Sequence, residues 1–219
     1  MFSKSTLAGA GALLAAPILV IAGTLAQPTL SDDAATQVAA LTVHRGAMIA
    51  GLTLRTTGLI LLIAGAVWLA LTLAPRAPRL AMAGGVLGVL GSLVVLFESG
   101  VSAAAPAIAD TLDRAQATAV LDRISTGAVS ALDPLAILGD IGVALLGIAA
   151  ARAGAPRWAA AAIVIGALGE GAGFATGTKA LVIISFALLF AGLLQAVRTL
   201  VTRAAPQPAA ETAQAAAVA

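Results

Sequence analysis

The sequence has no cysteine, no tyrosine, a single histidine and few charged side chains. Without cysteine it can form no disulfide, thiolate nucleophile or cysteine-ligated metal site, and one histidine excludes most histidine-rich metal sites. Charged residues make up 10% of the 219 residues, against about 25% in an ordinary soluble domain. No catalytic or cofactor-binding motif remains, so we expect no enzyme, no metal and no cofactor.

Apolar residues are abundant instead. They form 60% of the chain before its 23 glycines are counted, and the mean hydropathy is +1.05. A soluble fold of this size could not bury so much apolar surface, since soluble domains are about 45–50% apolar with glycine included. The composition therefore excludes a soluble enzyme and a nucleic-acid-binding domain. We expect the chain to be embedded in a lipid bilayer.

Six runs are long and apolar enough to cross a hydrocarbon core, which takes about 20 residues of helix. They cover about residues 7–26, 54–75, 80–98, 134–151, 158–177 and 180–202. Helices are expected because an unpaired backbone cannot cross lipid. The sequence thus predicts an all-α membrane helix bundle, with one transmembrane domain over residues 1–203 and a disordered tail at 204–219.

The first run has an alternative interpretation. Lys4, the apolar stretch and Thr24-Leu25-Ala26 resemble a secretory signal with its cleavage site. The apolar stretch is longer than the 7–15 residues usual in such signals, which favours a retained helix. Cleavage would leave five spans and would not change the orientation of the others.

The distribution of charge predicts the orientation. With the N-terminus in the cytoplasm, most basic residues fall inside, as the positive-inside rule requires. Both termini are then cytoplasmic, and two segments, 27–46 and 99–133, lie outside. The seven inner basic residues are Lys4, Arg76, Arg79, Arg152, Arg157, Arg198 and Arg203.

Each outer segment is predicted to contain a short helix. Ser31-Asp32-Asp33 is typical of a helix start. In the second segment an amphipathic helix is expected after Pro106, and Asp133 is expected to cap the fourth span, with a proline following it. The apolar face of that amphipathic helix would consist of Ile108, Leu112, Ala115 and Ala119.

Ionisable residues inside the spans are the candidates for chemistry, because charge is costly in lipid. Asp140 lies about 10 Å below the outer surface and Glu170 about 18 Å along its helix from the inner one, at 1.5 Å per residue. Glu98 and Arg55 lie at the outer ends of their spans. One hypothesis is an outward-facing polar cavity whose carboxylates take up a proton or a small cation. The other is that Arg55 pairs with an acid and the remaining acids only stabilise helix contacts.

Small residues repeat every four positions in two spans. Gly84, Gly88 and Ser92 do so in the third span, and Gly169, Gly173 and Gly177 in the fifth. Such stripes let membrane helices approach closely. Packing inside the bundle is the expected use, and a dimer interface is the alternative.

The arrangement loosely resembles the uncharacterised small polytopic membrane proteins of high-GC bacteria. The likeness rests on alanine-rich spans, aspartate-rich outer segments and the turns Ala77-Pro78-Arg79 and Ala155-Pro156-Arg157. It implies a multi-pass protein of the bacterial cytoplasmic (plasma) membrane and supplies neither an activity nor site residues.

Two functions remain open at this point. The first is a non-catalytic structural, accessory or partner-binding protein, whose partners would be the bilayer and either another membrane protein or a second copy of the chain. The alternative is a proton- or cation-coupled transporter of a small solute that uses the outer-half carboxylates, above all Asp140 and Glu170. Neither function involves nucleic acid.

Overall fold

The computed structural model describes residues 4–30 and 33–204, except the side chains of residues 128, 129, 203 and 204. These ranges hold helices, turns and bends, and they contain no strand. The helices are α1 (Lys4–Ala26), α2 (Ala34–Leu73), α3 (Pro78–Thr111), α4 (Arg114–Ile124), the short π-helix η1 (Ser125–Val129), α5 (Asp133–Arg152), α6 (Arg157–Ala175) and α7 (Lys179–Ala204).

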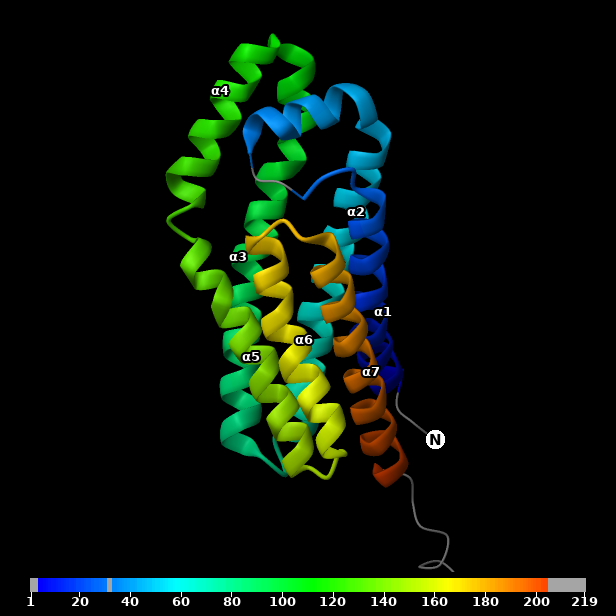
Figure 1. The fold of residues 1–219 in the computed structure, drawn as a ribbon. Helices are drawn as coiled ribbons and strands as arrows, with labels where there is room; N and C mark the ends of the chain where they lie inside the picture. The colour runs from blue at the N-terminus through cyan, green and yellow to red at the C-terminus, as the bar shows by residue number, and fades with distance from the viewer. Residues whose placement is uncertain (1–3, 31–32, 205–219) are drawn as a thin grey trace, which may run out of the picture.

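Among the described residues, six helices are long and apolar enough to cross a membrane: α1, α2, α3, α5, α6 and α7. They are the six predicted spans, so the expected all-helical bundle is confirmed. The helices run alternately up and down, and both ends of the described chain lie at one end of the bundle (Figure 1). We call this the terminal end. The tail at 205–219 lies outside the described residues.

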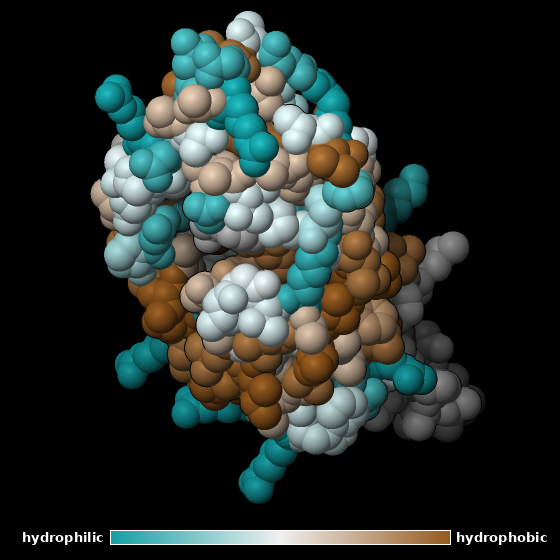
Figure 2. Space-filling model, turned by 45° about the horizontal axis from the view of Figure 1, so that its top comes forward, coloured by the Kyte–Doolittle hydropathy of each residue, from teal (hydrophilic) through white to brown (hydrophobic). Residues whose placement is uncertain are grey.

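The outer surface suits a lipid environment. On the face drawn in Figure 2, apolar side chains form a band between polar side chains at the two ends of the molecule. Large apolar side chains of the long helices are exposed, among them Leu71 with 65% and Ile165 with 59% of its surface exposed. Such exposure is costly in water and favourable in hydrocarbon, so the surface supports a multi-pass membrane protein.

The six long helices form a ring in chain order. Each packs against the next one along the sequence, and α7 closes the ring against α1. The closest packing is within three pairs, α1–α2, α3–α5 and α6–α7. The main apolar core lies between the pairs and contains Leu69, Leu73, Leu146 and Leu189.

Glycines bring α3 and α5 into contact. A Cβ atom at Gly84 would lie 2.8 Å from the Gly142 carbonyl oxygen, and a Cβ atom at Gly142 would overlap the Gly88 backbone. Ser92, the third member of this stripe, is buried, and its amide nitrogen faces Gly139. The stripe therefore faces a neighbouring helix of the same chain, where close backbone approach stabilises the pair.

The second stripe is used in part. Gly173 faces α7, where a Cβ atom would lie 2.9 Å from the amide nitrogen of Val182, and a Cβ atom at Gly169 would lie 2.5 Å from the Ser185 hydroxyl. Gly177 differs from the expectation. It lies in the turn after α6 with φ +63° and has no atom within 4 Å of a would-be Cβ, so its role is the left-handed turn that glycine adopts most readily.

The end of the bundle opposite the termini carries additional helical structure, which we call the cap. It consists of residues 34–43 of α2, residues 99–111 of α3, α4 and η1, and Figure 1 shows it above the six-helix ring. Non-helical angles at His44 separate the first segment from the rest of α2. Asp33 caps this segment, because its carboxylate accepts hydrogen bonds from the Thr36 hydroxyl and N–H, and these bonds lower the pKa of Asp33.

The second outer segment differs from the prediction. Helix α3 continues through Pro106 to Thr111. The helical conformation is interrupted at Leu112, and α4 follows. The break occurs where Asp113 accepts a hydrogen bond from the Gln116 N–H at 2.9 Å and so starts a new helix. Ala115 and Ala119 of the expected apolar face are consequently exposed, and the buried residues of α4 are Ala117 and Leu121.

Asp133 does not cap α5, contrary to expectation. The residue before it, Leu132, already has helical angles, and no side chain caps the helix. Asp133 is instead the first residue of α5, followed by the expected proline. The cause is local: the chain enters α5 from η1 and a turn, so Asp133 lacks the extended conformation that a capping residue needs.

A second apolar cluster holds the cap together. It includes Val38, Leu41, Met48, Ala117 and Leu121, which come from α2 and α4. Arg45 and Asp110 form an exposed ion pair between α2 and α3. The cap is thus a packed layer over one end of the ring, held mainly by apolar contacts, since exposed ion pairs contribute little.

Candidate functional site

The four ionisable residues singled out from the sequence line one cavity. It has a volume of about 620 Å³, and Arg55, Glu98, Asp140 and Glu170 reach it from α2, α3, α5 and α6 respectively. Each of these residues is separated from the others by at least 30 positions in the sequence. They meet because their four helices surround the same space in the half of the bundle that lies away from the termini.

Helix lengths fix the depth of the carboxylates. Asp140 is seven residues below the start of α5, about 10 Å, and Glu170 is five residues from the end of α6, about 8 Å. Both helix ends point toward the cap, so the two side chains lie at similar heights in the cap half of the bundle. Leu69, Leu73 and Leu146 are almost fully buried, and none of them lines this cavity.

Asp140 and Glu170 face each other. Both carboxyl groups line the same cavity, and they lie close enough to interact across the gap between α5 and α6. Two adjacent carboxylates repel each other, so one proton shared by the pair removes that repulsion. Gly171 makes room for the pair, because a Cβ atom there would touch the Asp140 carboxylate.

The other oxygen of Glu170 has a different environment. Its Oε2 atom is buried and has no hydrogen-bond partner among the residues that the structure describes. Buried polar atoms are normally paired, and an exception calls for an explanation. Glu170 lines the cavity with its other atoms, so this oxygen is an unsatisfied acceptor within the cavity wall.

Arg55 occupies the wall between α2 and α6. Its guanidinium carbon lies 5.3 Å from the centre of the Phe174 ring, within cation–π range. The backbone of α2 approaches α1 closely here, since a Cβ atom at Gly23 would lie 2.8 Å from the Arg55 amide nitrogen. Close helix packing and the aromatic ring together hold the guanidinium at the cavity wall.

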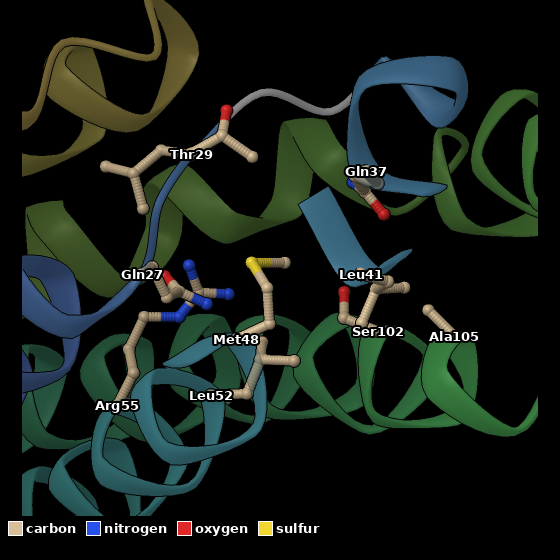
Figure 3. A pocket seen from close by; sticks show the side chains of 10 residues that line it. Gln27, Thr29, Gln37, Leu41, Met48, Leu52, Arg55, Ser102 and Ala105 are labelled. Atoms are coloured by element: carbon tan, nitrogen blue, oxygen red, sulfur yellow. The ribbon is translucent and has the colours of Figure 1, made fainter. Parts of the chain in front are cut away.

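A smaller cavity of about 40 Å³ adjoins the first one beneath the cap (Figure 3). The two share Arg55, Gln37 and Ser102 in their linings. Figure 3 shows Arg55 and Gln27 beside each other, with Met48 next to them. The polar side chains form one continuous region that runs from the carboxyl pair toward the cap.

Several lining residues were missed by the sequence reasoning. Asp133 lines the cavity seven residues before Asp140, and this spacing, which puts both on nearly the same helix face, was the available signal. Gln27, Gln37 and Phe174 gave no signal, because each becomes part of a wall only when distant helices pack together. In the described part of the chain, no group of three or more potential metal ligands is found.

The remaining walls are apolar. They include Leu59 of α2, Val95 of α3, Ile137 of α5 and Leu168 of α6, and Leu121 of the cap closes one side. A pocket with apolar walls and a few convergent polar groups is the usual form of a small-molecule site. The volume also falls within the range of about 300–1,000 Å³ that is typical of such sites.

No protein-family model matches the chain, and no match is found among curated proteins or solved structures. The fold and the cavity are therefore the only basis for describing the class of protein. It is an all-helical bundle with six helices able to cross a membrane, and ionisable side chains line a cavity in one half of the bundle.

Proposed function

We propose that the chain is a proton- or cation-coupled transporter of a small solute, with the carboxyl pair of Asp140 and Glu170 as its coupling site. One observation carries the proposal: these two side chains lie next to each other on the wall of a cavity large enough for a solute. Ionisable groups inside membrane helices commonly belong to proton or ion pathways.

Coupling follows from the chemistry of the pair. Two adjacent carboxylates repel each other. The proton between the two carboxyls therefore leaves only if another positive charge or solvent stabilises the second carboxylate. A solute that binds in the cavity therefore changes the protonation of the pair, and the proton in turn changes the affinity for the solute. This reciprocity is the thermodynamic basis of coupled transport.

The packing suggests which parts would move. The pairs α1–α2, α3–α5 and α6–α7 pack closely, and contact between pairs is looser. Asp140 and Glu170 belong to different pairs, α3–α5 and α6–α7. A rocking motion of these pairs would open and close the cavity while keeping the close backbone contacts within each pair, as rigid-body mechanisms of transporters require.

We propose further that both termini are cytoplasmic and that the cavity faces the outside of a bacterial plasma membrane. The short turns at the terminal end contain Arg76, Arg79, Arg152 and Arg157, which supports this orientation by the positive-inside rule. Because the chain has no cysteine, single-cysteine labelling tests it. Gln116→Cys is expected to react with an impermeant reagent in intact cells, and Pro75→Cys only after permeabilisation; the reverse pattern would invert the topology.

A structural, accessory or partner-binding role is the competing proposal. Its support in the sequence was the lack of any catalytic or cofactor motif together with the small-residue stripes, yet Gly84, Gly88, Gly169 and Gly173 face helices of the same chain. These stripes are consequently not available to a partner. A partner protein that copurifies stoichiometrically, combined with full activity of that complex after substitution of Asp140, would favour this role over transport.

The transport proposal is tested in liposomes that contain the full chain and a lumenal pH dye. 1,4-Diaminobutane, glycine, gluconate and potassium chloride are added separately, and protein-free liposomes give the background. At least one probe is expected to change the lumenal pH above background. Asp140→Asn and Glu170→Gln should abolish the change, and Asp122→Asn, which alters an exposed acid of α4 outside the cavity, should preserve it. If no probe exceeds the background, the proposal is overturned.

A further inference from the structure

We propose that the solute is an organic ammonium ion with an apolar body, and that its ammonium group binds between Asp140 and Glu170 in exchange for the proton held there. This inference rests on the transport function proposed above and names its substrate class. It combines three features of the cavity: its charge, its apolar walls and the exchangeable proton.

The charge of the cavity favours a cation. Four carboxyl groups line it, those of Glu98, Asp133, Asp140 and Glu170, against the one guanidinium of Arg55. These are all of the charged groups in its lining: α1 contributes Val20, and the cap contributes apolar side chains, the amide of Gln37 and the hydroxyls of Ser102 and Ser125. Even with one proton on the carboxyl pair, acids outnumber the base, so a cation is attracted and an anion repelled.

The hydrogen-bonding capacity of the pair favours an ammonium group in particular. Asp140 and Glu170 both line the cavity, and each ionised carboxylate is a hydrogen-bond acceptor only. An ammonium group has three N–H donors and no acceptor. It can therefore bond both carboxylates at once, which a carboxylate, an alcohol with its single donor or a quaternary ammonium cannot do.

The walls determine what the rest of the solute looks like. Leu59, Val95, Ile137 and Leu168 surround the space beside the pair, and Leu121 of the cap covers it. Burial of a hydrocarbon body against such side chains is favourable by about 25 cal/mol per Å². Both faces of a small aromatic or aliphatic group could be covered in a space of about 620 Å³.

The exchange conserves charge. The O–H bond of the protonated carboxyl breaks, its proton passes to water in the cavity, and the incoming ammonium ion takes its position between two carboxylates. One positive charge enters for each one that leaves. Binding of the amine is consequently weakened by acid, because protons and the ammonium group compete for the same oxygens.

The experiment is a titration of the purified full chain in detergent with benzylammonium chloride, in weakly buffered solution with a pH indicator. About one proton is expected to be released per ion bound, from the exchange of one ammonium for one proton. Asp140→Asn and Glu170→Gln should each weaken binding at least about tenfold, the loss expected from removing a charged hydrogen-bond partner. Asp122→Asn should behave like the native chain, and thermal unfolding should show that all variants are folded.

Three matched probes decide the substrate class. Sodium benzoate has the same body and the opposite charge, benzyltrimethylammonium keeps the charge and lacks N–H donors, and potassium chloride lacks the body. All three are expected to release no proton and to compete weakly with benzylammonium. If benzoate, benzyltrimethylammonium or potassium binds as well as benzylammonium, or if benzylammonium binds without releasing a proton, the inference is overturned.

The two proposals fail in different ways. Suppose that glycine, gluconate or potassium changes the lumenal pH but benzylammonium does not bind. The chain is then a proton-coupled transporter of another substrate class. Benzylammonium binding with proton release but no lumenal pH change with any probe would support the ammonium site and overturn transport.

Discussion

The two faces of α5 differ sharply although they share one short stretch of sequence. On one face, Gly139 and Gly142 touch the backbone of α3 so closely that a Cβ atom at Gly142 would overlap it. On the other, Asp133, Ile137 and Asp140 border a cavity of about 620 Å³. Gly139 and Asp140 are neighbours in sequence, and the helical turn of 3.6 residues separates them by about 100°.

The difference shows how a membrane bundle combines rigidity with a binding space. Apolar association gains little in lipid, so helices are held by close contact of small residues. That contact fixes α5 against α3. The stability it provides offsets the packing that is lost where the acids on the other face of α5 border the cavity. Substitutions on the first face should act on stability, and substitutions on the second on binding.

The largest effect is expected from Gly142→Ala, because the added methyl group meets the Gly88 backbone, which cannot move aside as a side chain would. Overpacking of this kind costs about 1–3 kcal/mol or more. Thermal unfolding in detergent measures the loss. Gly88→Ala is the matched control on the same contact, since its methyl group would lie 3.9 Å from Gly142. Equal stability of the two variants would contradict the close contact described here.

The next largest effect concerns the cavity face. Glu170→Gln and Asp140→Asn should abolish proton-coupled binding and leave the thermal midpoint unchanged or higher, because neutral amides bury no charge. Unfolding curves and the benzylammonium titration on the same samples separate the two readouts. A drop in stability as large as that of Gly142→Ala would instead assign these acids a structural role.

A smaller effect is expected from Gly171→Ala. The added methyl group would meet the Asp140 carboxylate, the movable end of a side chain rather than backbone. The carboxyl should shift, and the affinity for benzylammonium should fall several-fold with little change in the unfolding temperature. Gly100→Ala serves as control, since no atom lies near its would-be Cβ. Unchanged affinity in Gly171→Ala would mean that the position of the Asp140 carboxyl does not matter for binding.

The smallest effect is expected at the cap, far from both faces of α5. Hydrogen bonds from Thr36 lower the pKa of Asp33, so this carboxylate stabilises the start of α2 above its ordinary pKa. That stabilisation is lost as the pH falls through the lowered pKa. The hydrogen-exchange protection of residues 34–37, corrected for the intrinsic pH dependence of amide exchange, should fall in acid, and Asp33→Ala should lower it at all pH values. Asp33→Asn keeps the acceptor and should remove the pH dependence; if it does not, another group titrates there.

Within the site, the sequence pointed to individual residues and not to their arrangement. Asp140 and Glu170 stood out because acids are rare in apolar spans, and the estimated depths put both in the same half. That they face each other depends on the rotation of α5 and α6 about their axes, which backbone contacts such as Gly139 with α3 and Gly173 with α7 set. Phe174 and Gln27 could not be assigned, because neither is unusual in its own segment.

The errors at the cap have a similar origin. Pro106 was expected to start a helix, but it lies inside α3, and Asp113 starts the new helix. A proline and an aspartate are both acceptable helix starts, and the choice between them depends on tertiary contacts. Ala105 belongs to the cap cluster and Pro106 is buried, which favours continuing α3 past the proline.

The sequence by itself determined that the chain is helical, where its six apolar helices lie and which residues carry charge within them. These properties follow from composition and length, because lipid requires an internally hydrogen-bonded backbone and a fixed span. The tertiary structure alone decided which glycines touch, where Asp113 divides the cap, and that residues from four helices meet around one cavity. Such contacts depend on helix rotation and on the packing of segments far apart in the chain, and no local pattern specifies them.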